Sequence, residues 1–246
     1  MKPLIRNLAL LVGLGAPLIA LIGMILTRFH AVDYAVGQGV MGLQVGWWGA
    51  IAGVALGGLA LALSVSELKR AGPAIALGLV ASAATLGAIG LFRARSAGQP
   101  PVHDVSTDWS DPVMFSKGLI ADREASHAAN PVEADPRVPA GAGAPWAGQR
   151  VAEVNARTCP GAKPISHGVD ADKASAALQK LGVQITGSAP FRVEGVREGL
   201  WYAQQDDVAV RIRPGRTDVR ATSRSLANDH GGNCRLVTAI VQALSR

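Results

Sequence analysis

The residues best suited to chemistry are concentrated near the C-terminus, between Thr217 and Arg235. Acids, arginines, amides, a serine and a histidine share these nineteen positions: Asp218, Arg220, Ser223, Arg224, Asn228, Asp229, His230, Asn233 and Arg235. Their spacing matches neither a known zinc site nor the strand-turn-helix motif of a serine nucleophile. The stretch therefore predicts a polar cluster without a recognisable catalytic motif.

The first hypothesis for this cluster is an anion-binding site. Arg220, Arg224 and Arg235 flank Gly231 and Gly232, where the pattern predicts the start of a helix. Free N–H groups at a helix N-terminus bind anions, and arginine matches the planar geometry of phosphate or carboxylate. The ligand would be an anionic lipid headgroup, an envelope polymer or a small acid.

The competing interpretation is a structural network. Asp229 or Asn228 would cap the helix, and Asp206, Asp207 and Asp218 would pair with the arginines. The sequence leaves both interpretations open.

A second hypothesis is an envelope hydrolase or a metal-dependent enzyme. His103 and Asp104 would fold back onto Ser223, Asp229 and His230. Histidine suits both a general base and a metal ligand. The same segment also fits a turn whose Asp and Ser side chains bond to their own backbone. We expect no cofactor and no metal, and favour a non-enzymatic protein.

A third hypothesis is an adaptor that docks an envelope protein, reaching it through a long Pro/Gly segment. Charge argues against nucleic acid as a partner. Residues 1–99 carry seven Lys/Arg against two acids, whereas residues 100–246 carry seventeen against sixteen. The excess positive charge flanks hydrophobic segments, which is a membrane-topology pattern.

Three stretches without charge predict three transmembrane helices within residues 1–95. They are Asn7–Thr27, Tyr34–Ser66 and Ala71–Phe92. About 20 apolar residues cross a bilayer. We place the second span at Val45–Leu63, with Trp47 and Trp48 at an interface. The remainder, Tyr34–Gln44, then becomes a loop outside the membrane.

Lys2, Arg6, Lys69 and Arg70 would lie on one side of the membrane, against Arg28, Arg93 and Arg95 on the other. The positive-inside rule then predicts a cytoplasmic N-terminus, an uncleaved first helix and a C-terminal domain outside the cytoplasm. Gly53 and Gly57 form a G-x-x-x-G spacing that indicates close helix packing, within this bundle or in a dimer. No span contains a charged residue, which disfavours transport.

Residues 96–150 read as a Pro/Gly-rich linker that wraps the surface of the following domain. Residues 151–246 then predict a soluble domain. Asp170–Leu181 has a helical pattern, and Leu236, Val237 and Ile240 recur at helical spacing. About four strands with alternating patterns lie between them. The fold class is therefore a three-helix membrane anchor plus an α+β domain, whose antiparallel sheet has two helices on one face.

Cys159 and Cys234 are the only cysteines. In a domain outside the cytoplasm they would form a disulfide that closes a long loop. Alternatively, Cys234 is a small buried residue of the last helix.

Three motif segments stand out: Pro100–Thr107, Asp206–Arg211 and Thr217–Arg235, which include Asp207, Arg211, Ser223 and Asn233. Together they resemble the domain of unknown function 1499 family. The resemblance covers Gln99–Arg246. The chain departs from the family pattern at Ala221 or Thr222, at Leu226 and at His230. The resemblance implies a bacterial inner-membrane or exported protein, here multi-pass with a periplasmic domain, and supplies no established activity.

Overall fold

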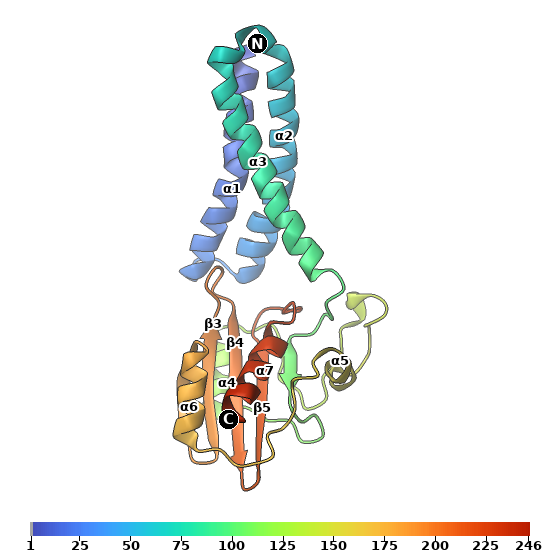
Figure 1. Ribbon diagram of the computed structural model, residues 1–246, viewed down its shortest axis with the longest axis vertical. Helices are drawn as coiled ribbons and strands as arrows, with labels where there is room; N and C mark the ends of the chain where they lie inside the picture. The colour runs from blue at the N-terminus through green and yellow to red at the C-terminus, as the bar shows by residue number, and fades with distance from the viewer. Residues whose placement is uncertain (1) are drawn as a thin grey trace. The chain divides into compact units, whose positions relative to one another are not determined.

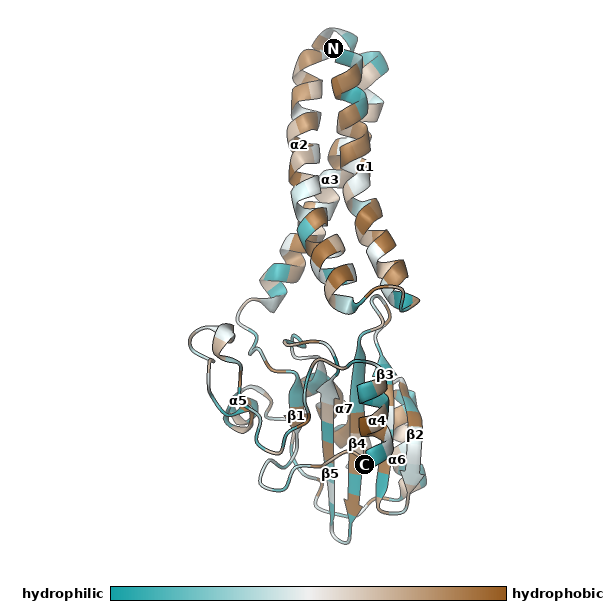
Figure 2. Cartoon of the chain, turned by 180° about the vertical axis from the view of Figure 1, so that it is seen from behind, coloured by the Kyte–Doolittle hydropathy of each residue, from teal (hydrophilic) through white to brown (hydrophobic). Residues whose placement is uncertain are grey.

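The computed structural model describes Lys2–Arg246, and the chain forms two compact units. The first unit ends at Gly98 and also includes Trp201–Ala203, and the second unit holds the rest from Gln99 onward. Figure 2 shows that the helices of the first unit are predominantly hydrophobic, whereas the second unit mixes polar and apolar segments.

The first unit is a bundle of three helices, each long and apolar enough to cross a membrane, as predicted. The helices are α1 (Lys2–Arg28), α2 (Gly46–Leu63) and α3 (Leu68–Ser96) (Figure 1). A single 3-10 turn, Val65–Glu67, lies between α2 and α3.

The prediction that Tyr34–Gln44 forms a loop is wrong. A π-helix, Ala35–Val45, runs directly into α2, so the apolar helical segment extends over Ala35–Leu63. Glycine explains the difference, because a Cβ atom at Gly37 would lie 1.7 Å from Thr27 Oγ1 and 2.8 Å from the Gly23 carbonyl oxygen of α1. The glycines thus serve close helix packing rather than a loop.

The three helices approach one another closely through Gly13, Gly53 and Gly78. A Cβ at Gly13 would lie 2.6 Å from the Gly78 carbonyl oxygen, and one at Gly53 would lie 3.0 Å from Gly13 Cα and 2.2 Å from Ser82 Oγ. A Cβ at Gly57 would lie 2.5 Å from Leu79 of α3. Both glycines of the G-x-x-x-G spacing therefore face helices of their own bundle.

The second unit is built on an antiparallel sheet of five strands in the order β1-β5-β4-β3-β2. The strands are β1 (Asp104–Ser106), β2 (Val183–Ala189), β3 (Arg192–Glu198), β4 (Gln205–Arg213) and β5 (Arg216–Ser223). The α+β class is confirmed, and the predicted number of strands was one too low. The missing strand is β1, which has only three residues and too short a pattern to predict.

Two helices cover one face of this sheet, as Figure 1 shows: α6 (Ala171–Lys180) and α7 (Gly232–Leu244). The Asp170 side chain accepts N–H bonds from Asp172 and Lys173, so α6 starts at its predicted cap. The core between helices and sheet is made of aliphatic side chains at alternate strand positions and at helical spacing. It includes Leu178, Val193, Val208, Val210, Val219, Ala221, Leu236 and Ile240, all at most 2% exposed.

The opposite face of the sheet is covered too, which corrects the prediction of a sheet with helices on one face only. Helix α4 (Lys117–Ala125) lies there, visible from behind in Figure 2, and Leu119 packs against Ala209 of β4. Asp218, Arg220 and Thr222 of β5 are consequently 0% exposed. Polar groups buried in this way need partners.

The segment 96–150 therefore contributes more than irregular chain: it supplies β1, α4 and a 3-10 turn at Ala140–Ala142. Helix α5 (Val151–Thr158) follows it, and Val151 and Val154 pack on Val102 and Val138 of the segment. The domain thus has four helices, two more than predicted.

Candidate functional site

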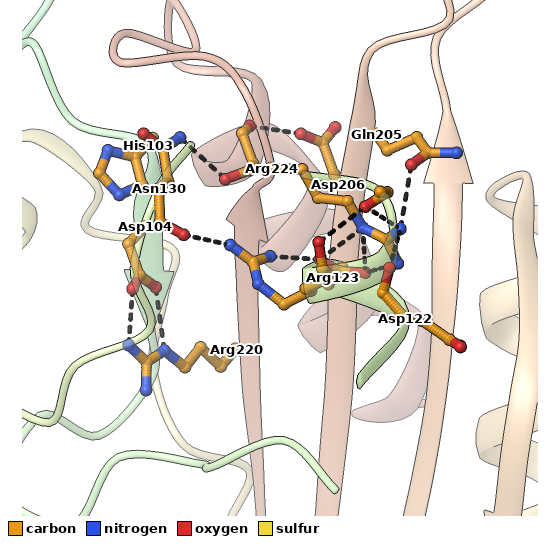
Figure 3. Close-up of polar contacts among 12 residues, drawn as sticks. His103, Asp104, Asp122, Arg123, Asn130, Gln205, Asp206, Arg220 and Arg224 are labelled. Atoms are coloured by element: carbon orange, nitrogen blue, oxygen red, sulfur yellow. Dashed lines mark hydrogen bonds and ion pairs between the residues drawn. The ribbon is translucent and has the colours of Figure 1, made fainter. Parts of the chain in front are cut away.

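Arg220 is fully buried and all three of its guanidinium nitrogens donate hydrogen bonds, of which Figure 3 draws those to Asp104. Nε and Nη2 donate to the two Asp104 carboxylate oxygens at 3.0 and 2.6 Å. Nη1 and Nη2 also donate to the carbonyls of Val113 and Glu133. The Trp109 ring lies 5.2 Å from the guanidinium carbon. This arginine therefore joins β5 to β1 and leaves no donor for a ligand.

Asp207 holds a second buried group of charges. Arg224 donates to it from Nη2 at 2.6 Å and from Nε at 3.0 Å, and Arg123 of α4 donates from Nη1. Arg123 Nη2 also bonds the Asn130 carbonyl, while the Asn130 amide reaches the carbonyls of Ser223 and Leu226. This cluster ties α4 to β4 and β5.

Asp218 is the third buried acid, and three arginines surround it. Arg211 donates at 3.1 Å, Arg213 at 2.6 Å and Arg216 at 2.9 Å. Arg211 and Arg213 also form ion pairs with Asp111 near the surface. Hydrogen bonds from Arg213, and to a lesser extent from Arg211, lower the pKa of the Asp111 carboxyl. The sequence-predicted residues Asp207 and Arg211 are thus members of ion-pair clusters.

The start of α7 is organised by Asp229. Its carboxylate accepts N–H bonds from Gly231 and Asn233, each at 2.8 Å, so it caps the helix. The Asn233 amide donates to the His103 carbonyl and to Ser223 Oγ, and Ser223 Oγ donates to Asp206. Burial is the main cause that raises the pKa of Asp229 from 3.8 to about 6. Burial likewise raises the pKa of Asp206.

The two histidines of the hydrolase hypothesis, His103 and His230, lie in partly buried positions. Burial lowers the pKa of His103, opposed mainly by the Asp104 charge, but the Asp104 carboxylate is held by Arg220. Burial, and then Arg235, lowers the pKa of His230, which adopts a left-handed backbone conformation with φ of 52°. Across the described residues, Lys2–Arg246, no three His, Cys, Asp or Glu residues are grouped to hold a metal ion.

One arginine of the C-terminal stretch differs from the others. Arg235 is exposed, and within the described chain its guanidinium makes one hydrogen bond, from Nη1 to the His230 carbonyl at 3.1 Å. A Cβ built at Gly231 would lie 3.1 Å from this guanidinium and 3.3 Å from Gln99 Oε1. The glycine thus leaves room for both side chains beside the helix start.

A cavity of about 210 Å³ opens next to Arg235, and we call it the α7 pocket. Its walls come from the residues before β1, the end of α5 and the start of α7. They are Gln99, Pro100, Val102, Val105, Asn155, Thr158, Asp229, Gly231, Cys234 and Arg235.

Cys159 and Cys234 form a disulfide, with the sulfur atoms 2.03 Å apart. It joins the end of α5 to the first turn of α7, and Cys234 lines the α7 pocket. The bond therefore fixes two walls of this pocket to each other.

Sequence reasoning missed Arg123, Asn130 and Gln99, which all come from the segment that precedes α5. Arg123 follows Leu119 by four residues, and both face the sheet on α4. That spacing was the available signal, but a charged residue on a helix face is more often solvated than buried.

The fold and the ion pairs define a protein class. A bundle of three candidate transmembrane helices precedes an α+β domain, and buried Arg–Asp clusters hold the elements of that domain together. The model of the family described as "Protein of unknown function (DUF1499)" matches residues 104–244. The chain therefore belongs to the DUF1499 family, which confirms the resemblance. No curated protein and no solved structure matches it.

Proposed function

We propose that this protein is a multi-pass protein of the bacterial inner membrane whose C-terminal domain lies in the periplasm and binds an anionic group in the α7 pocket. The group is a phosphate or carboxylate carried by an envelope component. The observation that carries the proposal is Arg235, an exposed arginine that forms no ion pair in the described chain, on the wall of a cavity at a helix start.

The chemistry of the pocket suits an anion with an adjoining apolar part. Arg235 offers a planar fork of donors, and Gln99 and Thr158 add neutral polar groups. Val102, Val105 and Pro100 supply the apolar wall. A helix start adds a favourable dipole for negative charge.

Asp229 on the same wall opposes an anion when it is ionised. Because its pKa is about 6, the carboxyl is largely neutral below that pH and charged above it. Affinity for an anion of constant charge, such as sulfate, is therefore expected to rise as the pH falls through about 6.

The structure supports binding better than hydrolysis. The Asp104 carboxylate is held by Arg220, and both Asp229 oxygens accept backbone N–H bonds. Both acids are thus engaged within the fold, which favours binding over acid–base chemistry with His103 or His230. Docking of an envelope protein remains compatible with the same pocket if the partner presents a carboxylate.

The test uses the full chain in nanodiscs of neutral lipid, titrated with inorganic phosphate at pH 7.5. Phosphate at ten times its Kd is expected to stabilise the domain by about 1.4 kcal/mol, which raises Tm by roughly 4 °C. Arg235→Ala is expected to abolish this shift while it leaves the ligand-free Tm within about 1 °C of the parent, because surface substitutions change stability little.

Arg213→Ala is the matched control, since Arg213 is also partly exposed but lies at the other end of the sheet. It should keep the phosphate shift. Equal shifts in the parent and in Arg235→Ala, or no shift in either, would refute the proposed site. Repeating the titration in nanodiscs with anionic lipid separates a headgroup from a free anion, because bound headgroups would compete with phosphate.

A further inference from the structure

The connection between β3 and β4 presents two large apolar side chains at its tip. Leu200 is 75% exposed and Trp201 is 65% exposed. The backbone N–H of Gly199 donates to the Gln204 carbonyl at 2.8 Å and closes the loop below them. A Leu–Trp pair held on a hairpin and left in water is costly unless another surface covers it.

The strand register places this loop at the end of the sheet where the chain enters the domain. Asp104, the first residue of β1, pairs with Thr222 of β5, and Thr222 pairs with Asp207 of β4. The neighbouring Asp206 pairs with Arg197 of β3, one residue from the end of that strand. The start of β1 and the β3–β4 loop therefore lie at the same end of the sheet.

The short chain segment between α3 and β1 limits how far this end of the sheet can be from the membrane. Helix α3 ends at Ser96 and β1 begins at Asp104, so seven residues separate them. Seven residues span at most about 25 Å when fully extended. Arg93 and Arg95 in the last turn of α3 are typical of the headgroup level of a bilayer.

We propose that the Leu200–Trp201 loop inserts into the interfacial region of the same bilayer that the three helices span, and so forms a second membrane contact for the domain. Tryptophan prefers this region because its ring is apolar and its N–H finds water or headgroup partners. Leucine beside it adds apolar area for the acyl boundary. The proposal depends on the membrane spans and is independent of ligand binding in the α7 pocket.

Phe191 provides a matched control within the same sheet. It is 65% exposed, like Trp201, but it lies in the turn between β2 and β3 at the opposite end of the strands. A lone exposed aromatic on that edge is a normal surface feature.

The experiment places a nitroxide label at Leu200→Cys in the full chain in nanodiscs and measures its collisions with oxygen, which concentrates in lipid, and with a water-soluble nickel chelate. A second protein carries the label at Phe191→Cys. We expect the ratio of oxygen to nickel collisions to be at least about fivefold higher at position 200, with Trp201→Ser in the same chain reducing it.

Three outcomes would overturn the proposal. High nickel access at position 200 means that the loop stays in water. Low access to both reagents means that protein, from this chain or a second copy, covers it. A ratio unchanged by Trp201→Ser means that the tryptophan does not hold the loop in lipid.

Discussion

At the scale of single residues, the C-terminal arginines separate into structural and available groups. A buried guanidinium is tolerated only when acids and carbonyls satisfy its donors. Arg220 and Arg224 meet this condition through Asp104 and Asp207, while Arg235 does not require it because it is exposed. Burial thus distinguishes an arginine that holds the fold together from one that could contact a ligand.

Arg224→Ala is expected to destabilise the domain by about 3 kcal/mol or more, because it leaves Asp207 with Arg123 alone in a fully buried position. Urea denaturation in detergent micelles, followed by tryptophan fluorescence, measures the loss. Arg213→Ala should cost less than about 1 kcal/mol, since Arg213 is 38% exposed and Asp218 keeps two other arginines. Equal stabilities of both variants would contradict the structural role of Arg224.

The raised pKa of Asp229 predicts that the free energy of unfolding decreases as the pH rises. Its pKa is raised from 3.8 to about 6, so the folded protein binds this proton more tightly than the unfolded chain does. Its contribution is therefore fully present below about pH 4 and is lost as the pH rises to about 6, a decrease of up to about 3 kcal/mol. Asp206, whose pKa is also raised, acts in the same direction.

The free energy of unfolding should be measured between pH 4 and 7 for the parent and for Asp229→Asn. The difference between the two curves isolates this carboxyl from other titrating groups. We expect the parent to lose stability relative to the variant across this window. Parallel curves would show that Asp229 titrates alike in the folded and unfolded chain.

At the scale of elements, the helix bundle depends on glycine where helices cross. Gly53→Leu should lower Tm in detergent, with a cost of roughly 1–3 kcal/mol, because a Cβ there would lie 2.2 Å from Ser82 Oγ. Gly58→Leu is the matched control, since no atom lies within 4 Å of a Cβ at Gly58. If the bundle tolerates both substitutions equally, the helices do not pack through Gly53.

The elements that could be predicted from sequence are those with a regular hydrophobic periodicity or a helix-capping residue. Helix α6 has Asp170 as its cap, and strands β4 and β5 alternate Val208, Val210, Val219 and Ala221 toward the helices. The family motifs likewise placed Arg220, Arg224 and Asn233 in one region. These features depend on local spacing, which a sequence displays.

The rest depends on contacts between distant segments. Strand β1 is defined only by its pairing with β5, more than a hundred residues later, and α4 gains its role from Arg123 meeting Asp207. The sequence also could not tell which arginine stays free, because Arg220, Arg224 and Arg235 differ only in what covers them. Burial of that kind is a tertiary property, absent from periodicity.

At the scale of the whole molecule, the remaining prediction concerns the side of the membrane on which the DUF1499 domain lies. Lys2, Arg6, Lys69 and Arg70 exceed the basic residues of the other side by one, which favours a cytoplasmic N-terminus. The Cys159–Cys234 disulfide gives independent support, because such bonds persist in oxidising compartments such as the periplasm.

Reporter fusions in a bacterial host test this arrangement. Alkaline phosphatase, which is active only when exported, is expected to be active when fused after Arg246 and inactive when fused in the turn Val65–Glu67 between α2 and α3. The same cells should yield a chain whose cysteines resist alkylation until a reductant is added. Activity at Val65–Glu67 together with inactivity after Arg246 would reverse the orientation, and free cysteines in that case would follow from the reducing cytoplasm.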